Sequence, residues 1–185
     1  MYLETDRVKL VEITRDDEPK LFSLDSHPEV MRYISKGVAS SKEEVRAVIE
    51  RIIALKNKHN GKFGCWAAIE KDSGEFIGWF LFRPAHQDAE NTKRIELGYR
   101  LKKTFWRRGL ATEVSRALIE KGFREYSVDE IFAVAIKTNF GSQAVMEKSG
   151  LSFVREFYSD EFTDSMDLLV EFSIRGDQLR YEPKL

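Results

Sequence analysis

The chain has 185 residues, of which 42% are hydrophobic and 33% are charged, a balance that suits one globular domain and excludes disordered, collagen-like and disulfide-scaffold classes. Its 30 basic and 31 acidic residues leave a net charge of -1, so the chain as a whole has no charge excess that would attract nucleic acid or an anionic membrane. The apolar runs fall far short of the ~20 residues that a membrane helix requires, and the first residues lack the pattern of a signal peptide. We therefore expect a cytoplasmic protein that binds neither nucleic acid nor membrane.

The cysteine and histidine content argues against a disulfide or a metal site. Cys65 is the only cysteine, so no internal disulfide can form and a cysteine-based zinc site is excluded. His27, His59 and His86 are scattered along the chain without the spacing of metal ligands. Cys65 stands in an apolar segment beside Trp66 with no histidine near it in the sequence, which favours a packed side chain over a covalent nucleophile.

The first third of the chain predicts one strand followed by helices. Residues 7–13 alternate between polar and apolar side chains, which predicts a strand buried on one face. Thr14 is suited to cap a helix that follows, and Pro28 to open a second, short helix. Ser41, with a glutamate three residues later, has the pattern of a capping box, and apolar residues then recur at helical spacing up to residues 58–61.

The rest of the chain alternates between strands and helices. Residues 63–70 and 75–83 are strand-like and flank the turn-rich tetrapeptide 71–74, which predicts an antiparallel hairpin. Residues 93–101 predict a third strand, and 110–126 predict a helix whose wide apolar face suits packing on a sheet. The further elements predicted in chain order are a strand at 131–136, a helix at 141–149 and two strands at 153–159 and 166–174.

This order of elements predicts an α/β (α+β) fold, with a mixed sheet of about seven strands and helices on both faces. No internal repeat or linker interrupts the chain. We therefore interpret residues 1–185 as a single domain in which residues 176–185 form a short polar tail.

A basic turn between a strand and a helix is the strongest functional signal. The strand 95–101 leads through Phe105-Trp106-Arg107-Arg108 to Gly109, after which the helix begins. Such a turn directs free backbone amides at one point and is able to hold a pyrophosphate. Gly109 would allow close approach of the backbone, and Ala111 keeps the first helical turn slim. On these residues alone, a solvated loop is an equal alternative.

This segment resembles the signature of the GNAT superfamily, Gln/Arg-x-x-Gly-x-Gly/Ala, in which Gly109 and Ala111 match the last two positions. Trp106 stands where Gln or Arg is usual, a departure typical of the branch that looks like ribosomal-protein N-terminal acetyltransferases (RimJ/RimL-like). Downstream, Asn139-Phe140-Gly141-Ser142 followed by Glu147-Lys148-Ser149-Gly150-Leu151 is similar to the family's Asn-x-x-Ser helix and the Glu-Lys-Leu-Gly-Phe after it. The resemblance covers residues 63–154 well and the N-terminal helices loosely.

The resemblance implies a mostly antiparallel GNAT sheet and an N-acetyltransferase that uses acetyl-CoA as co-substrate, without a metal. It implies that the strand before the basic turn and the strand 131–136 splay apart and that the pantetheine arm lies between them. The residues implied to bind acetyl-CoA are Leu97, Gly98, Tyr99 and Leu101 beside the arm, Arg107, Arg108, Gly109, Leu110, Ala111 and Thr112 beside the pyrophosphate, and Asn139 and Ser142 beside the pantetheine and sulfur.

Direct acetyl transfer requires a neutral amine, a donor for the developing oxyanion and a proton for the leaving thiolate. We predict Glu96 as the base that accepts the amine proton. The alternative for Glu96 is an ion pair with Arg94 or Lys93 at a strand edge. A backbone amide of residues 97–99, exposed by a bulge, is the predicted oxyanion donor.

The sequence leaves open which group supplies the proton for the thiolate. The resemblance places the Ser142 hydroxyl near the sulfur, and local helix capping is the alternative role of Asn139 and Ser142. Met146 stands where many relatives have a tyrosine acid. Protonation must then come from Ser142, from water or from another residue.

The acceptor is predicted to be a primary amine, and relatives leave open a protein N-terminus, another peptide, a polyamine, an amino sugar or another small molecule. Tyr33, Trp79 and His86 are the candidate acceptor-site residues. The acidic segment 160–164 either attracts a cationic acceptor or forms a solvated turn. We expect a monomer or a homodimer.

Two other classes of function compete with an enzyme. A non-catalytic acyl-CoA sensor would retain the phosphate-binding turn without turnover, and the presence of Glu96 and Ser142 argues against it. A plain nucleotide-binding domain is disfavoured because the chain lacks both Gly-x-x-x-x-Gly-Lys and Gly-x-Gly-x-x-Gly.

Overall fold

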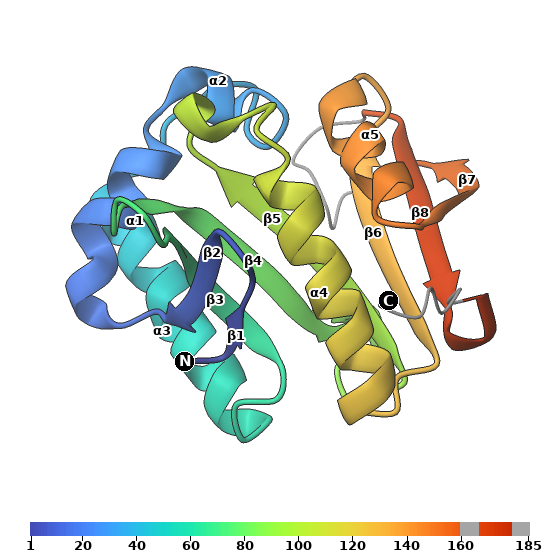
Figure 1. The fold of residues 1–185 in the computed structure, drawn as a ribbon. Coiled ribbons are helices and arrows are strands. Elements are labelled where there is room, and N and C mark those ends of the chain that lie inside the picture. The colour runs from blue at the N-terminus through green and yellow to red at the C-terminus, as the bar shows by residue number, and fades with distance from the viewer. Residues whose placement is uncertain (160–166, 179–185) are drawn as a thin grey trace.

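The computed structural model describes residues 1–159 and 167–178 and places them around one central sheet (Figure 1). Within these residues the sheet has eight strands in the order β1-β2-β3-β4-β5-β6-β8-β7. All neighbouring strands are antiparallel except β5 and β6, which are parallel. The strands are β1 (Leu3–Glu4), β2 (Val8–Glu12), β3 (Gly64–Glu70), β4 (Phe76–Pro84), β5 (Arg94–Leu101), β6 (Glu130–Ile136), β7 (Ser152–Phe157) and β8 (Leu169–Arg175).

The predicted mixed, mostly antiparallel sheet is confirmed, and the strand that sequence analysis missed is β1. This strand has only two residues, Leu3 and Glu4, which pair with Leu10 and Lys9 of β2. Two residues are too few to show an alternating pattern, so their position in the sheet is set by the neighbouring strand.

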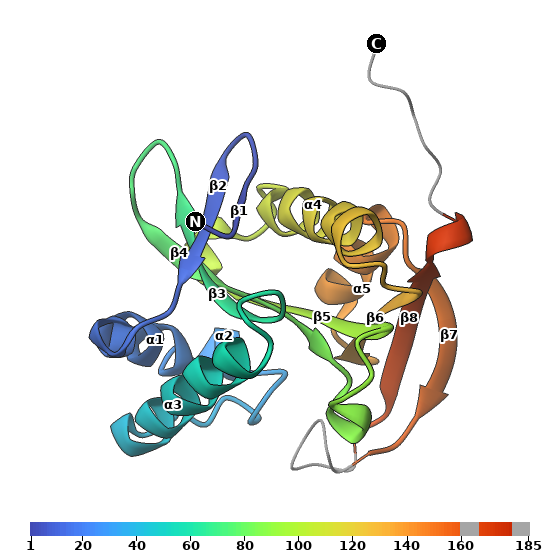
Figure 2. The same ribbon diagram turned by 90° about the horizontal axis from the view of Figure 1, so that it is seen from below.

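Helices cover both faces of the sheet, as predicted (Figure 2). One face carries α1, α2 and α3, and the opposite face carries α4 and α5. The α-helices are α1 (Glu18–Asp25), α2 (Pro28–Met31), α3 (Lys42–Lys58), α4 (Leu110–Glu125) and α5 (Phe140–Lys148), and single 3₁₀ turns are η1 (Arg15–Asp17), η2 (His86–Asp88), η3 (Lys103–Phe105) and η4 (Gly176–Gln178).

Alternation along the strands produces two hydrophobic cores. In β3, Trp66 and Ala68 face the core under α4, whereas Cys65 and Ala67 face the core under α1 and α3. On the apolar face of α4, Val114 and Leu118 are completely buried. Each large side chain buried in this way contributes roughly 1.5–3 kcal/mol, so the two cores fix the sheet between its helices.

The local signals for helix starts are largely confirmed. The Ser41 hydroxyl accepts a hydrogen bond from the Glu44 amide (3.2 Å), and the Glu44 carboxylate accepts one from the Ser41 amide (2.6 Å), which completes the predicted capping box. The helix expected directly after Thr14 begins instead with the 3₁₀ turn η1, because the Asp17 carboxylate accepts a hydrogen bond from the Thr14 amide (2.9 Å).

Cys65 has the surroundings that the sequence suggested. Cys65 is buried in the core under α1 and α3, and burial raises the pKa of its thiol to about 12. Such a thiol is inert at neutral pH, so the packed role is confirmed.

In the described ranges, no cluster of three or more His, Cys, Asp or Glu side chains is placed to hold a metal ion. Each helix in the part of the chain that the structure covers is too short or too polar to span a bilayer.

Candidate active site

Strands β5 and β6 form a fork in the middle of the sheet. They pair over only three positions, Arg94 with Glu130, Ile95 with Ile131 and Glu96 with Phe132. Beyond Glu96 each strand stays with its other neighbour, β5 with β4 and β6 with β8. The two strands therefore diverge, as the resemblance implied, and a cleft of about 1620 Å³ extends from the fork to the start of α4.

The prediction of a bulge in β5 is wrong. The register between β4 and β5 is unbroken from the Gly78–Leu101 pair to the Pro84–Ile95 pair. Residues 97–101 lack a partner strand on their other side because β6 departs, and divergence of the strands thus replaces a bulge as the source of free backbone groups.

Most of the predicted coenzyme-binding residues line this one cleft. The lining includes residues from β5, from the turn before α4, from the first turn of α4 and from the start of α5. The predicted residues found there are Tyr99, Leu101, Arg107, Gly109, Leu110, Ala111, Thr112, Asn139 and Ser142. Three others are outside it: Leu97 is 2% exposed in the core, Gly98 packs against Leu81, and Arg108 forms an ion pair with Glu70 (2.5 Å).

The turn before α4 has the conformation that a glycine favours. Gly109 is the N-cap of the helix and has φ +78°, in the left-handed region where side chains with a Cβ are strained. Arg107 also has a positive φ of 60°. The first amides of α4 have no acceptor within the helix, and the residues that carry them line the cleft. They form a neutral, preorganised site for an anion.

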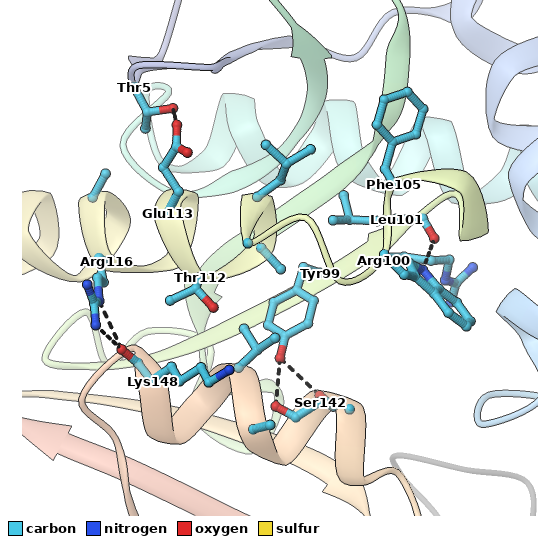
Figure 3. A pocket seen from close by; sticks show the side chains of 18 of the residues that line it. Thr5, Tyr99, Arg100, Leu101, Phe105, Thr112, Glu113, Arg116, Ser142 and Lys148 are labelled. Carbon is cyan, nitrogen blue, oxygen red and sulfur yellow. Dashed lines mark hydrogen bonds between the residues drawn. The ribbon is translucent and has the colours of Figure 1, made fainter.

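Side chains from the N-terminal hairpin hold this turn in place. The Arg7 guanidinium donates to the backbone oxygen of Arg108 (2.9 Å) and to the Glu113 carboxylate (2.6 Å). Glu113 also accepts a hydrogen bond from the Thr5 hydroxyl (2.6 Å), as Figure 3 shows. Burial by itself raises the pKa of Glu113, but these hydrogen bonds hold that pKa below its ordinary value. Sequence analysis missed this contact because its partners are about a hundred positions apart in the chain.

Trp106, the residue that departs from the signature, also has a structural role. Its indole nitrogen donates a hydrogen bond to the backbone oxygen of Leu101 (2.8 Å). This bond closes the connection between the end of β5 and the turn before α4. A tryptophan at position 106 thereby fixes where the free amides of α4 lie relative to the fork.

A tyrosine and a serine meet across the cleft. Tyr99 extends from β5 to α5, and its hydroxyl lies 3.0 Å from both the hydroxyl and the backbone oxygen of Ser142 (Figure 3). Burial raises the pKa of Tyr99 to about 12, so the phenol keeps its proton at neutral pH. The Asn139 side chain accepts a hydrogen bond from the Ser142 amide (3.1 Å), which confirms the capping role. Met146 is 3% exposed within the core.

Glu96 lies at the apex of the fork, on the other face of the sheet. Successive side chains of a strand alternate, so Glu96 and Tyr99 face opposite sides, and Glu96 is not part of the cleft lining. Glu96 is 8% exposed, and its Oε2 accepts hydrogen bonds from both Nε (3.1 Å) and Nη2 (3.0 Å) of Arg83, its partner across the strands. The alternative pairing with Arg94 or Lys93 is wrong, because the register of β4 and β5 puts Arg83 opposite Glu96.

The predicted acceptor-site residues are separated by the fold. Tyr33 lines the cleft. Trp79 lies in β4 and is not part of the lining. The central carbon of the Arg100 guanidinium lies 4.9 Å from the centre of the Trp79 ring. His86 is exposed in η2, away from the cleft. The acidic segment 160–164 lies outside the described residues.

Comparison with known proteins agrees with this geometry. The sequence model of the acetyltransferase (GNAT) domain family matches residues 7–152. The chain is 29% identical over 161 residues to the FsC-acetyl coenzyme A-N(2)-transacetylase of Aspergillus fumigatus, covering 85% of this chain and 67% of that protein. A GNAT-family acetyltransferase from Bacillus anthracis has a similar structure, with a TM-score of 0.81, 20% identity and coverage of 96% and 99%. The RimL acetyltransferase of ribosomal protein L7/L12, solved with coenzyme A, follows with a TM-score of 0.77, 15% identity and coverage of 94% and 97%.

Proposed function

Because this chain belongs to the GNAT family of acetyltransferases, we propose that it binds acetyl-CoA in the forked cleft and transfers the acetyl group to a primary amine. The observation that carries the proposal is the continuity of one cleft from the amides at the start of α4, past the fork, to the Ser142 hydroxyl. Gly109 to Thr112 would bind the pyrophosphate, and the unpaired edge of β5 would bind the pantetheine arm. Residues 1–185 would act as one N-acetyltransferase domain.

Glu96 is the proposed general base. Both of its hydrogen bonds from Arg83 end on Oε2, and no described residue donates a hydrogen bond to Oε1. Arg83 thus fixes the carboxylate and leaves one oxygen for the amine. The amine would reach Glu96 from the face of the sheet that carries α1 to α3, opposite the face on which Tyr99 lies.

The side chains at the fork can accept and supply the protons that acetyl transfer moves. The amine nitrogen attacks the thioester carbonyl carbon, so that the N–C bond forms and the C–S bond breaks. The nitrogen loses a proton to Glu96, and the departing sulfur gains one through the Ser142 hydroxyl, which regains its own proton from solvent. Tyr99 would orient Ser142 through the contact between the two hydroxyls (3.0 Å).

The acceptor is proposed to be a peptide N-terminus or a small molecule. The relatives named above act on different amines, since one is a transacetylase of FsC and another acetylates a ribosomal protein. The common feature is a primary amine, which the free oxygen of Glu96 would bind.

Incubation with acetyl-CoA and a panel of amines tests the proposal, with release of free thiol as the readout. Acetyl-CoA should also raise the melting temperature, because a ligand that binds only the folded state stabilises it by mass action. A melting temperature unchanged at millimolar acetyl-CoA would count against the proposed donor site. Binding without turnover on any amine would identify an acyl-CoA sensor instead.

A further inference from the structure

The face of β5 that carries Glu96 also carries an arginine that the proposed chemistry does not use. This face is formed by every second residue of β5, namely Glu96, Gly98 and Arg100. They lie opposite Arg83, Leu81 and Trp79 of β4, respectively. Gly98 has no side chain of its own, so the Leu81 side chain alone lies against the strand between the acid and the arginine. This position lies just past the point where the fork opens.

Arg100 is held rigidly and is one of the residues that line the cleft. Its Nη1 donates to the Asp25 carboxylate (2.5 Å), and the guanidinium lies over the Trp79 ring. The side chain is 15% exposed and lines the cleft together with Tyr33, whereas Asp25 is not part of the lining. The cleft therefore meets the positive partner of this ion pair.

The hydrogen bonds of Arg100 are incomplete. Nε is buried without a partner, and none of the described residues accepts a hydrogen bond from Nη2. A guanidinium carries five N–H groups in a fixed planar arrangement, suited to carboxylate and carbonyl oxygens. Native proteins seldom leave such a group with so few acceptors unless ordered water or a ligand supplies them.

The geometry points to Arg100 as the residue that binds an oxygen of the acceptor, a carboxylate or an amide carbonyl, while the amine lies beside Glu96. Side chains four positions apart on one strand start ~13 Å from each other, and two long side chains reduce that gap to a few bonds. An amino acid, an amino acid amide or a peptide N-terminus has an amine and an oxygen at such a spacing. A polyamine would instead bring a cation to the guanidinium, which disfavours it.

This inference rests on the proposed acetylation of amines, and a matched set of three acceptors tests it. Phenylalanine, phenylalanine amide and phenethylamine share a ring and a primary amine, but only the first two carry an oxygen. The kcat/KM of each should be expressed per neutral amine, because their amine pKa values differ. A charge-assisted hydrogen bond predicts a preference of roughly 10- to 100-fold for the oxygen-bearing acceptors over phenethylamine. A larger preference for phenylalanine than for its amide would identify carboxylate as the favoured oxygen.

Variants of the ion pair show whether Arg100 causes the preference. The double variant D25N/R100Q replaces the buried pair by neutral groups and avoids an unpaired buried charge. It should reduce the preference to about threefold or less, whereas R15Q, which removes an exposed arginine paired with Glu50, should keep it. An unchanged preference in folded D25N/R100Q would overturn the assignment, as would a wild-type protein that does not distinguish the three amines.

Calorimetry keeps this inference separate from the proposed function. Binding of the same three amines to the complex with CoA measures the preference without turnover. Selective binding that depends on Arg100, in a protein that acetylates nothing, would uphold the oxygen site and refute the catalytic proposal. Turnover without selectivity would do the reverse.

Discussion

The two sides of the fork differ in the groups that they present: backbone amides on one side and side chains on the other. On the proposed donor side, a strand, a turn and a helix that follow each other in the chain present backbone amides to the cleft, with Gly109 as the residue that permits the turn. On the proposed acceptor side, Glu96, Arg83 and Arg100 are side chains of two strands, and Asp25 comes from a helix far earlier in the chain. A backbone site tolerates most changes of side chain, whereas a side-chain site depends on each residue. The acceptor side should therefore respond more strongly to conservative substitution.

The largest effect is expected at Glu96. Replacement by glutamine keeps the shape and the contact with Arg83 but removes the base, and loss of a general base lowers turnover by ~100-fold. Because an α-amine has an ordinary pKa near ~8 and a lysine amine near ~10.4, higher pH supplies the neutral nucleophile without the enzyme. The deficit in kcat should shrink as pH rises.

The control for Glu96→Gln is Glu50→Gln, which breaks an exposed ion pair with Arg15 and should leave turnover unchanged. CoA affinity should be the same in both variants and in the wild type. If Glu96 only ties β4 to β5, its variant loses stability or CoA affinity while turnover per folded, saturated enzyme is retained. Wild-type turnover at neutral pH would eliminate the role as a base.

The difference between the two sides also explains what the sequence could predict. Most of the predicted coenzyme-binding residues line the cleft, because local patterns determine where they lie: the turn at Gly109 and the cap at Asn139 each depend on neighbours in the chain. The partner of Glu96 was predicted wrongly because the register of two strands puts Arg83 opposite it, and register is not visible in either segment alone. Arg7 and Glu113 were missed because they lie 106 positions apart in the chain.

A smaller effect is expected at Gly109, where the backbone of the donor side can be tested directly. Valine at this left-handed position strains the turn and displaces the amides of α4, so we expect CoA affinity to fall by roughly 10-fold, with a smaller change in kcat. Gly74→Val is a matched control, because Gly74 has φ +69° in the turn between β3 and β4, with nothing within 4 Å of an added Cβ. Both variants carry similar backbone strain, but only the first lies in the cleft. Equal CoA affinities, measured by calorimetry, would mean that the phosphates bind elsewhere.

The smallest effect is expected at Glu113, an acidic side chain that ties the proposed donor turn to the N-terminal hairpin through both Thr5 and Arg7. Glu113→Gln removes the charge from these hydrogen bonds and should lower the free energy of unfolding by about 1–2 kcal/mol at pH 7. The pKa of this carboxyl is lowered in the folded state, so its stabilisation is present above the unfolded value near ~4.3 and is lost as pH falls through the folded-state pKa. In urea titrations, the difference in the free energy of unfolding between wild type and variant should therefore stay constant from pH 7 down to about pH 4.5 and then disappear.

The control is Glu120→Gln, on the same helix in an exposed pair with Arg124, which should differ from wild type by less than about 0.5 kcal/mol at every pH. A gap for Glu113→Gln that persists unchanged into acid would show that shape rather than charge secures the turn, and the donor side would then depend on backbone and packing alone.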